Sequence, residues 1–223
     1  MIVGVLLAAG ASRRMGRAKA LVQSGGESFV VHGIRRLWSA CDQVVVVLGA
    51  EAPRIRRAAG RELERLAGAG RLRRAPARAR EPEPDHLEAR FIVNRAWQGG
   101  MLSSARAGLR EALRARPEAV LVLPVDHPAV RPRTVADLGH VLLQALAACR
   151  TPRERAHFSY ALIPRFRRRR GHPIALSPAL ARAVAADPDA EDLSDGIRRN
   201  ARLVGYLDVS DAGVVRNRNT PRD

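Results

Sequence analysis

The stretch VGVLLAAGASRRMGRAK, from Val3 to Lys19, decides how this chain folds. The apolar run Ile2–Leu7 has the length of a buried strand. Small residues follow it, Ala8 to Gly10, and they let the backbone turn sharply. We therefore predict a first strand that ends in a loop with little side-chain bulk.

That loop carries a hydroxyl group and several cations, among them Ser12, Arg14 and Lys19. Exposed backbone N–H groups and fixed cations together suit an anion with several negative oxygens, such as a nucleoside triphosphate. Two other phosphate loops are excluded. A P-loop needs Gly-Lys where this chain has Gly16-Arg17, and the Gly-x-Gly-x-x-Gly of a dinucleotide site is missing.

The use of lysine in this chain also favours phosphate binding. Lysine and arginine together number 39, and Lys19 is the only lysine. A sequence that writes every other cation as arginine keeps a compact ammonium group at this position. The alternative is an arginine-rich surface turn after an edge strand, which does not explain the single lysine.

The loop resembles the signature of the MobA-like nucleotidyltransferases, Leu-Ala-Ala-Gly-x-Ser-x-Arg-Met-Gly-x-x-Lys. The residues at its fixed positions are Leu7, Ala8, Ala9, Gly10, Ser12, Arg14, Met15, Gly16 and Lys19. The resemblance implies that the segment binds the nucleotide. It also implies that Arg14 and Lys19 are catalytic, stabilising the phosphate chain and the leaving pyrophosphate.

The following segments predict an α/β fold. A helix over Phe29–Ala40 and a buried strand over Val44–Leu48 complete a βαβ unit, which places both strands in one parallel sheet with its ligand site at the carboxyl edge. Further strands are predicted at Phe91–Asn94, Ala119–Val125, Phe158–Ile163 and Leu203–Val209, and further helices at Pro53–Leu66, Ala105–Ala115 and Arg133–Cys149.

We expect a single Rossmann-like nucleotidyltransferase domain over residues 1–223. Its sheet should be twisted and mainly parallel, with helices on both faces and one antiparallel strand, for which we predict Phe158–Ile163. Residues 67–90 are rich in Gly, Pro, Ala and charge, and they are predicted to form a flexible loop.

A second motif runs from Asn94 to Ser104 and reads NRAWQGGMLSS. It resembles the Asn-x-x-Trp-x-x-Gly-Met-x-Ser-Ser pattern of the molybdenum cofactor cytidylyltransferases. The resemblance implies that Gly100, Ser103 and Ser104 contact the base or ribose of the nucleotide. Local features describe a second possibility equally well, in which Ser103 or Ser104 caps a helix and Trp97 packs in the core.

Asp126 directly follows the apolar run Ala119–Val125. A carboxylate at the carboxyl end of a central strand, facing the phosphate loop, is suited to hold Mg²⁺ against a triphosphate. The alternative is an aspartate that only forms a turn. His127 is left out of the catalytic set, because a histidine beside a metal-binding aspartate more often supports the ligand or is exposed.

An arginine run, Arg165–Arg170, precedes the sequence Gly171-His172-Pro173. The Arg-Gly-His-Pro element resembles one that lines the acceptor side of the cleft in the cytidylyltransferases, which implies acceptor binding by Arg170, Gly171, His172 and Pro173. The other arginines of the run either attract an anionic acceptor or form a solvated face.

The end of the chain resembles the family's Asp-x-Asp-Thr-Pro-x-Asp, with Asn217 and Asn219 at the first two acidic positions. The resemblance implies that Asn219 is a second metal ligand. An asparagine carbonyl can bind Mg²⁺ but brings no charge, so weaker metal binding is expected.

The formal charge of +17 raises nucleic acid as a partner. The arginines are spread along the chain with few aromatics near them, so compositional bias is the preferred explanation and no nucleic-acid partner is expected. No apolar run is long enough to span a membrane. The start of the chain has no signal-peptide pattern, so a cytoplasmic protein is expected.

The resemblance implies transfer of CMP from CTP to a phosphate-bearing, pterin-type acceptor such as the molybdopterin-molybdenum cofactor, with Mg²⁺ and release of pyrophosphate. A molybdoenzyme is the partner protein that this implies. CTP is preferred because the Leu-Ala-Ala-Gly form is commoner among cytidylyltransferases. Three alternatives stay open: a guanylyl or sugar-phosphate nucleotidyltransferase, a non-catalytic carrier of a nucleotide or of molybdopterin, and a nucleic-acid-binding protein.

Overall fold

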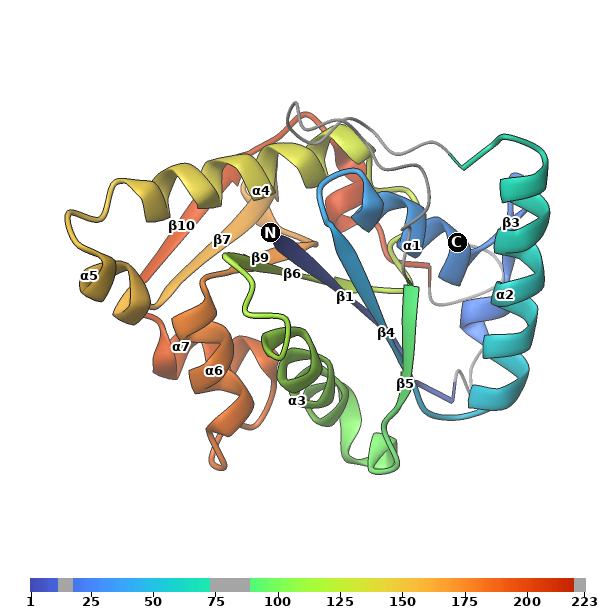
Figure 1. Cartoon of the computed structure of the whole chain (residues 1–223), viewed down its shortest axis with the longest axis horizontal. Coiled ribbons are helices and arrows are strands. Elements are labelled where there is room, and N and C mark those ends of the chain that lie inside the picture. Colours follow the sequence, from blue (N-terminus) through green and yellow to red (C-terminus); the bar gives the residue numbers. More distant parts are fainter. Residues whose placement is uncertain (12–17, 73–88, 219–223) are drawn as a thin grey trace.

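A computed structural model describes residues 1–11, 18–72 and 89–218. Within these residues one eight-stranded sheet has the order β10-β7-β9-β6-β1-β4-β5, with β8 paired to β7 (Figure 1). Its strands are β1 (Ile2–Ala8), β4 (Gln43–Leu48), β5 (Ala89–Val93), β6 (Ala119–Pro124), β7 (Tyr160–Phe166), β8 (Arg169–Arg170), β9 (Ile174–Leu176) and β10 (Leu203–Asp208). A small antiparallel pair, β2 (Gln23–Ser24) and β3 (Glu27–Ser28), lies outside this sheet.

Helices cover both faces of the sheet, as predicted. One layer contains α1 (Phe29–Trp38), α2 (Ala52–Gly68) and α4 (Pro132–Ala147), and the other contains α3 (Gly100–Leu113), α6 (Pro178–Ala186) and α7 (Leu193–Asn200). Alternate side chains of β1 serve the two layers. Leu6 joins the core on the α1 side, whereas its neighbour Val5 joins the core on the α3 side.

Strands β6, β1, β4 and β5 are parallel neighbours. Val5 of β1 stands beside Val45 of β4 and Val122 of β6. All seven residues of β1 are buried, which explains why the strand reads as a continuous apolar run. The carboxyl ends of these strands lie at one edge of the sheet, so the fold is the mainly parallel α/β class that the sequence predicted.

The antiparallel strand is not the one predicted. β9 runs antiparallel to both β6 and β7, so β7, which covers most of 158–163, has the direction of the parallel strands. The prediction for Phe158–Ile163 is wrong because α4 and α5 (Pro152–His157) form a crossover before β7. The chain reverses only after β7, through the tight turn at Arg167 and Arg168.

Three local details also differ from the predictions. Helix α3 begins at Gly100 with Gly99 as its N-cap, so the two serines lie inside its first turns and do not cap it. Helix α6 was not predicted, although Ser177 caps it by accepting a hydrogen bond from the Leu180 N–H. Residues 67–68 belong to α2 and 89–90 to β5, while 73–88 lie outside the described residues.

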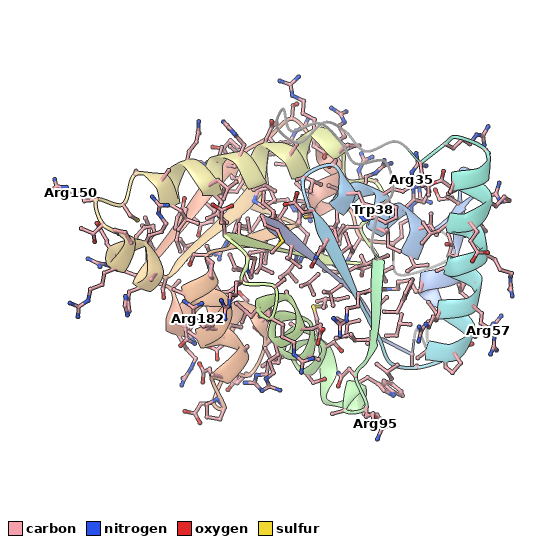
Figure 2. All side chains as sticks on the ribbon, in the orientation of Figure 1. Arg35, Trp38, Arg57, Arg95, Arg150 and Arg182 are labelled. Carbon is pink, nitrogen blue, oxygen red and sulfur yellow. The ribbon has the colours of Figure 1, made fainter. Side chains whose placement is uncertain are left out.

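The basic charge is distributed around the molecule. Figure 2 labels Arg57 on α2, Arg95 after β5 and Arg150 after α4, and these side chains project from different sides. Among the helices that the structure describes, none is both long and apolar enough to cross a bilayer.

Candidate active site

Lys19 and Asp126 meet at the carboxyl edge of the parallel strands. Lys19 begins a short 3₁₀ helix, η2 (Lys19–Leu21), and Asp126 follows the end of β6. Lys19 Nζ lies 3.4 Å from Asp126 Oδ2, and the two side chains are 16% and 17% exposed. The pair is therefore partly shielded from water, which strengthens its electrostatic effect on an anion or a cation that binds beside it.

The start of the signature loop is held by the segment after β4. Leu7, Ala8 and Ala9 are buried, whereas Gly10 is exposed. The Ala9 carbonyl accepts a hydrogen bond of 3.0 Å from the Ala50 N–H. The predicted residues Ser12 and Arg14 lie outside the described residues.

Gly49 joins this loop to the second motif. A Cβ atom at residue 49 would lie 2.6 Å from the Ala9 carbonyl oxygen and 2.5 Å from Trp97 Cβ. Only glycine permits this close approach. The segments that follow β1, β4 and β5 therefore converge at Gly49. Trp97 is half-buried and packs on the α3-side core, which agrees with one part of the second sequence interpretation, although neither serine caps the helix.

The second motif is organised by Asn94. Its Nδ2 donates to Ser103 Oγ at 2.9 Å and to Ser104 Oγ at 3.1 Å, and its Oδ1 accepts from the Ala96 N–H at 3.0 Å. Asn94 and Ser104 are buried, while Gly100 is exposed and Ser103 partly so. Gly100 is therefore accessible to a ligand, whereas Ser103 Oγ is engaged within the motif, 2.8 Å from the Ala96 carbonyl oxygen and 3.0 Å from that of Gly100. The buried Ser104 accepts from Asn94 and helps to hold it in place.

The predicted acceptor segment reaches Asp126 through two histidines. The rings of His127 and His172 lie 4.9 Å apart, and His127 Nε2 is 4.0 Å from Asp126 Oδ1. Gly171 and Pro173, which flank His172, are buried at this edge, whereas His172 itself is partly exposed. Arg170 instead lies on the exposed strand β8, with its guanidinium 6.0 Å from the Tyr206 ring centre. Of the predicted acceptor residues, the structure links His172 to Asp126, through the ring of His127.

Both histidines are held neutral near pH 7. Burial, as the largest cause, and the neighbouring His127 together lower the pKa of His172 to about 4, although Asp126 opposes the shift. Burial also lowers the pKa of His127, against the opposing effects of Asp126 and the Gly213 backbone, with Lys19 lowering it slightly more. Among these neighbouring side chains, Lys19 therefore supplies the positive charge.

A C-terminal segment that sequence reasoning missed forms another wall of the site. Asp211 is 3% exposed and accepts three hydrogen bonds of 2.8 Å, from the Arg131 N–H, the Thr134 hydroxyl and the Gly213 N–H. It precedes η4 (Ala212–Val215), where the Val214 carbonyl accepts from the His172 N–H at 2.9 Å. The sequence offered only an Asp-x-Gly turn as a signal for this residue.

The same segment continues to Asp126. The Arg218 N–H donates a 2.8 Å hydrogen bond to the Asp126 carbonyl. This contact brings the end of the described chain to the metal-ligand candidate. Asn219, the second predicted ligand, lies outside the described residues.

The donor set near Asp126 fits a metal ion that arrives with a substrate. In the described part of the chain, no group of three or more His, Cys, Asp and Glu side chains has a metal-binding arrangement. Mg²⁺ commonly binds one or two carboxylates together with substrate phosphates and water. Asp126 can therefore serve as the protein ligand, while substrate phosphates and water complete the coordination of the ion.

A sequence profile of the MobA-like NTP transferase domain matches residues 4–203. The chain belongs to this family. The MobA-like chain is also 33% identical to the nicotine blue oxidoreductase of Paenarthrobacter nicotinovorans, over 94% of this chain and 88% of that protein.

Two solved structures show the same fold. A Methanothermobacter nucleotidyl transferase aligns with a TM-score of 0.65 and 21% identity, covering 100% of this MobA-like chain and 94% of the other. Molybdopterin-guanine dinucleotide biosynthesis protein A from Archaeoglobus fulgidus aligns with a TM-score of 0.58 and 20% identity, covering 100% and 94%. At these identities the likeness establishes the fold alone.

Proposed function

We propose that this MobA-like domain transfers a nucleoside monophosphate from a nucleoside triphosphate to a phosphate-bearing acceptor, with release of pyrophosphate. The observation that carries the proposal is the Lys19–Asp126 pair at the carboxyl edge. The pair lies where ligands bind in open α/β sheets. Family membership supports the same class of reaction.

In this reaction a phosphate oxygen of the acceptor attacks the α-phosphorus, and the bond to pyrophosphate breaks. The protein needs no covalent nucleophile, because positioning and charge neutralisation supply most of the acceleration. Lys19 would bind the phosphate oxygens, and Arg14 of the signature loop is proposed to do the same. A divalent metal held by Asp126, which we take to be Mg²⁺, would neutralise charge on the triphosphate when bound.

The separation of Lys19 from Asp126 suits an exchange of partners. At 3.4 Å the contact is longer than the 2.7–2.9 Å typical of a strong charge-assisted hydrogen bond. Lys19 can therefore leave the carboxylate for a phosphate oxygen at modest cost, and Asp126 is then available to the metal. The neutral pair His127 and His172 adds no cation that would compete for the carboxylate.

The preferred nucleotide is CTP, on the basis of the Leu-Ala-Ala-Gly form of Leu7–Gly10. The preferred acceptor is a pterin-type phosphate such as molybdopterin-bound molybdenum, because Gly171, His172 and Pro173 match the acceptor motif. The position of the His172 ring beside His127, which neighbours Asp126, is compatible with this role. GTP and sugar-phosphate acceptors are the nearest alternatives within the same reaction class.

A second candidate function is oxidoreduction. The observation that favours it is the 33% identity with a relative named as an oxidoreductase. The pyrophosphate of a dinucleotide hydride donor carries the same kind of anionic oxygens as a triphosphate, so the same sheet edge could bind it. Against this candidate, the sequence lacks Gly-x-Gly-x-x-Gly after its first strand.

A product assay separates the two functions. The protein is incubated with CTP or GTP, Mg²⁺ and molybdopterin-molybdenum cofactor, and pyrophosphate is measured. Parallel samples contain NADH or NADPH with a quinonoid dye as electron acceptor, and the loss of reduced cofactor is followed by absorbance. Metal-dependent pyrophosphate release supports nucleotidyl transfer. Oxidation of the reduced cofactor without pyrophosphate release would establish the redox candidate instead.

A further inference from the structure

The turn between β7 and β8 is unusual for its sequence. Phe166 pairs with Arg169, so Arg167 and Arg168 form a two-residue hairpin loop. Their φ angles are 49° and 66°. Hairpin loops with positive φ at both residues favour Asn-Gly or Gly-Gly, because a Cβ atom is strained in that conformation. The chain's general preference for arginine over lysine explains which cation is used. It does not explain why a cation stands at positions 167 and 168, where the turn favours Asn-Gly.

The strand pairing next to this turn also places two like charges opposite each other, which is unfavourable for stability. Arg165 of β7 stands directly opposite Arg170 of β8, and like charges in such a pair repel. The guanidinium of Arg165 lies 4.6 Å from the Tyr206 ring centre, and that of Arg170 lies 6.0 Å from it. These contacts with an aromatic ring hold the cations in place.

Little negative charge compensates this hairpin. Asp208 pairs with Arg165 at 2.8 Å. For Arg167–Arg170, which are all exposed, the described residues provide no carboxylate partner. Four guanidinium groups of one short hairpin are thus available to an anion, with Arg167 over the Phe166 ring and Arg170 near the Tyr206 ring. Each can donate several hydrogen bonds to a phosphate group.

The hairpin is continuous with the active-site edge. Directly after Arg170, the Gly171 N–H donates to the Pro164 carbonyl at 2.9 Å, and the His172 ring then meets His127 beside Asp126. Because β7 runs in the direction of β6, its carboxyl end and the hairpin lie at the same edge of the sheet as Asp126. A molecule bound on the His172 side can therefore extend toward the arginines.

We propose that the hairpin Arg167–Arg170 is a second anion subsite, which binds an anionic group of the acceptor remote from the phosphate that reacts. The acceptor class is then a small molecule with at least two separated anionic groups. This inference rests on the proposed function, since it assumes that an acceptor occupies the His172 side. A single short hairpin suits a small anion better than a nucleic acid, because arginines elsewhere, such as Arg57, Arg95 and Arg150, point to different sides (Figure 2).

The test uses inorganic tripolyphosphate as the probe and isothermal titration calorimetry at fixed salt. Lys19→Ala is the background, because it weakens the nucleotide site. In that background, Arg167→Asn with Arg168→Gly supplies the turn sequence that the backbone favours. We expect at least a tenfold loss of tripolyphosphate affinity, with a melting temperature equal to or above that of the parent. Loss of binding with unchanged or higher stability would separate a ligand role from a structural one.

A matched control removes the same charge elsewhere. Arg153→Gln with Arg155→Gln changes two exposed arginines of α5 and should leave the affinity within twofold. If the hairpin variant keeps its affinity, or if the α5 control loses as much, the proposal is wrong. Should the Asn-Gly variant fold poorly, Arg168→Gln with Arg169→Gln repeats the test and keeps the aromatic contacts of Arg167 and Arg170.

Two further readouts separate this inference from the proposed function. Tripolyphosphate binding in the Lys19→Ala background does not depend on turnover, so failure of the transfer assay leaves the binding result standing. Where transfer is observed, the hairpin change should raise the KM for the acceptor at least tenfold and leave the KM for CTP unchanged. Salt-sensitive binding of a random DNA duplex that the hairpin change abolishes would assign the arginines to nucleic acid and overturn the proposal.

Discussion

The two halves of the sheet differ in burial and in charge. In the half made by β6, β1, β4 and β5, the strands β1 and β6 are buried along their whole length, and the chain presents Lys19 and Asp126 at the edge. In the other half, the edge strand β10 exposes Leu203 and Tyr206, and the adjoining hairpin carries uncompensated arginines. Within that other half β9 and most of β7 are also buried, so its exposed part is β10 with the hairpin. Buried strands can position reacting groups, whereas an exposed charged region can recognise a partner molecule.

The largest expected effect comes from the edge of the buried half. Asp126→Asn keeps the shape of the side chain but removes the charge proposed to hold the metal. Turnover in the pyrophosphate assay should fall by about a hundredfold or more, while the melting temperature stays nearly unchanged. Asp137→Asn, at an exposed aspartate of α4, is the control and should retain full activity. Equal activity in the two variants would remove Asp126 from the mechanism.

The junction of the two halves predicts a pH dependence of stability. The pKa of His172 falls from 6.5 in the unfolded chain to about 4 in the folded one, mainly through burial beside His127. Between these values the unfolded state binds more protons, so acid destabilises the fold. Above pH 6.5 the neutral His172 costs the fold nothing. As the pH falls toward about 4, the free energy of unfolding decreases by up to about 3 kcal/mol.

Urea unfolding at several pH values between 4 and 7 measures this effect. The His172→Gln variant should show a smaller loss of unfolding free energy on acidification than the parent, whatever its stability at neutral pH. Parallel pH profiles for the two proteins would contradict the lowered pKa of His172.

Packing density in the buried half can be tested at two helical glycines. At Gly108 of α3 a Cβ atom would lie 2.4 Å from Val5 Cγ1 and 2.8 Å from Val47 Cγ2. These stiff, buried side chains cannot move away freely, so Gly108→Ala should destabilise the protein by about 1–3 kcal/mol. Gly60 of α2 has nothing within 4 Å of a Cβ atom, and Gly60→Ala should stabilise by about 0.5–1 kcal/mol. Thermal unfolding of the two variants should give shifts of opposite sign.

The smallest expected effect lies in the exposed half. Arg165 forms two hydrogen bonds with Asp208, of 3.0 and 2.8 Å, but Asp208 is 70% exposed. Asp208→Asn should therefore change the free energy of unfolding by less than about 1 kcal/mol. Because the change adds net positive charge beside the hairpin, tripolyphosphate affinity should rise. A large loss of stability would show that the Arg165–Asp208 ion pair contributes more to the free energy of unfolding than an exposed pair should.

The sequence predicted the buried half better than the exposed half, for a physical reason. Strands covered on both faces read as continuous apolar runs, so the strands around Val5 and Val45 could be located directly. The direction of β7 depends on pairing with β9, which is not encoded in any local pattern. Helix α6 was missed because its segment Pro178–Ala186 consists mostly of alanine and small apolar residues, with a weak contrast between its faces.

In the candidate site, too, some residues could be predicted from local sequence patterns and others could not. Lys19 and Asp126 could be placed at one edge because each follows a recognisable strand. The ring contact of His127 with His172 and the hydrogen bonds of Asp211 depend on tertiary packing between distant segments. The proposed roles of Ser12, Arg14 and Asn219 rest on the family resemblance, because these residues lie outside the described ones.

The central claim is that the Lys19–Asp126 edge binds a nucleoside triphosphate together with a metal ion. Thermal shift tests it most directly, since a ligand that prefers the folded state raises the melting temperature. CTP, GTP, ATP, UTP, NADH and NADPH are each tested with and without Mg²⁺, on the parent protein and on Asp126→Asn. The account predicts a Mg²⁺-dependent shift, largest with CTP, that Asp126→Asn loses. A shift only with NADH or NADPH, independent of Mg²⁺ and of Asp126, would contradict it.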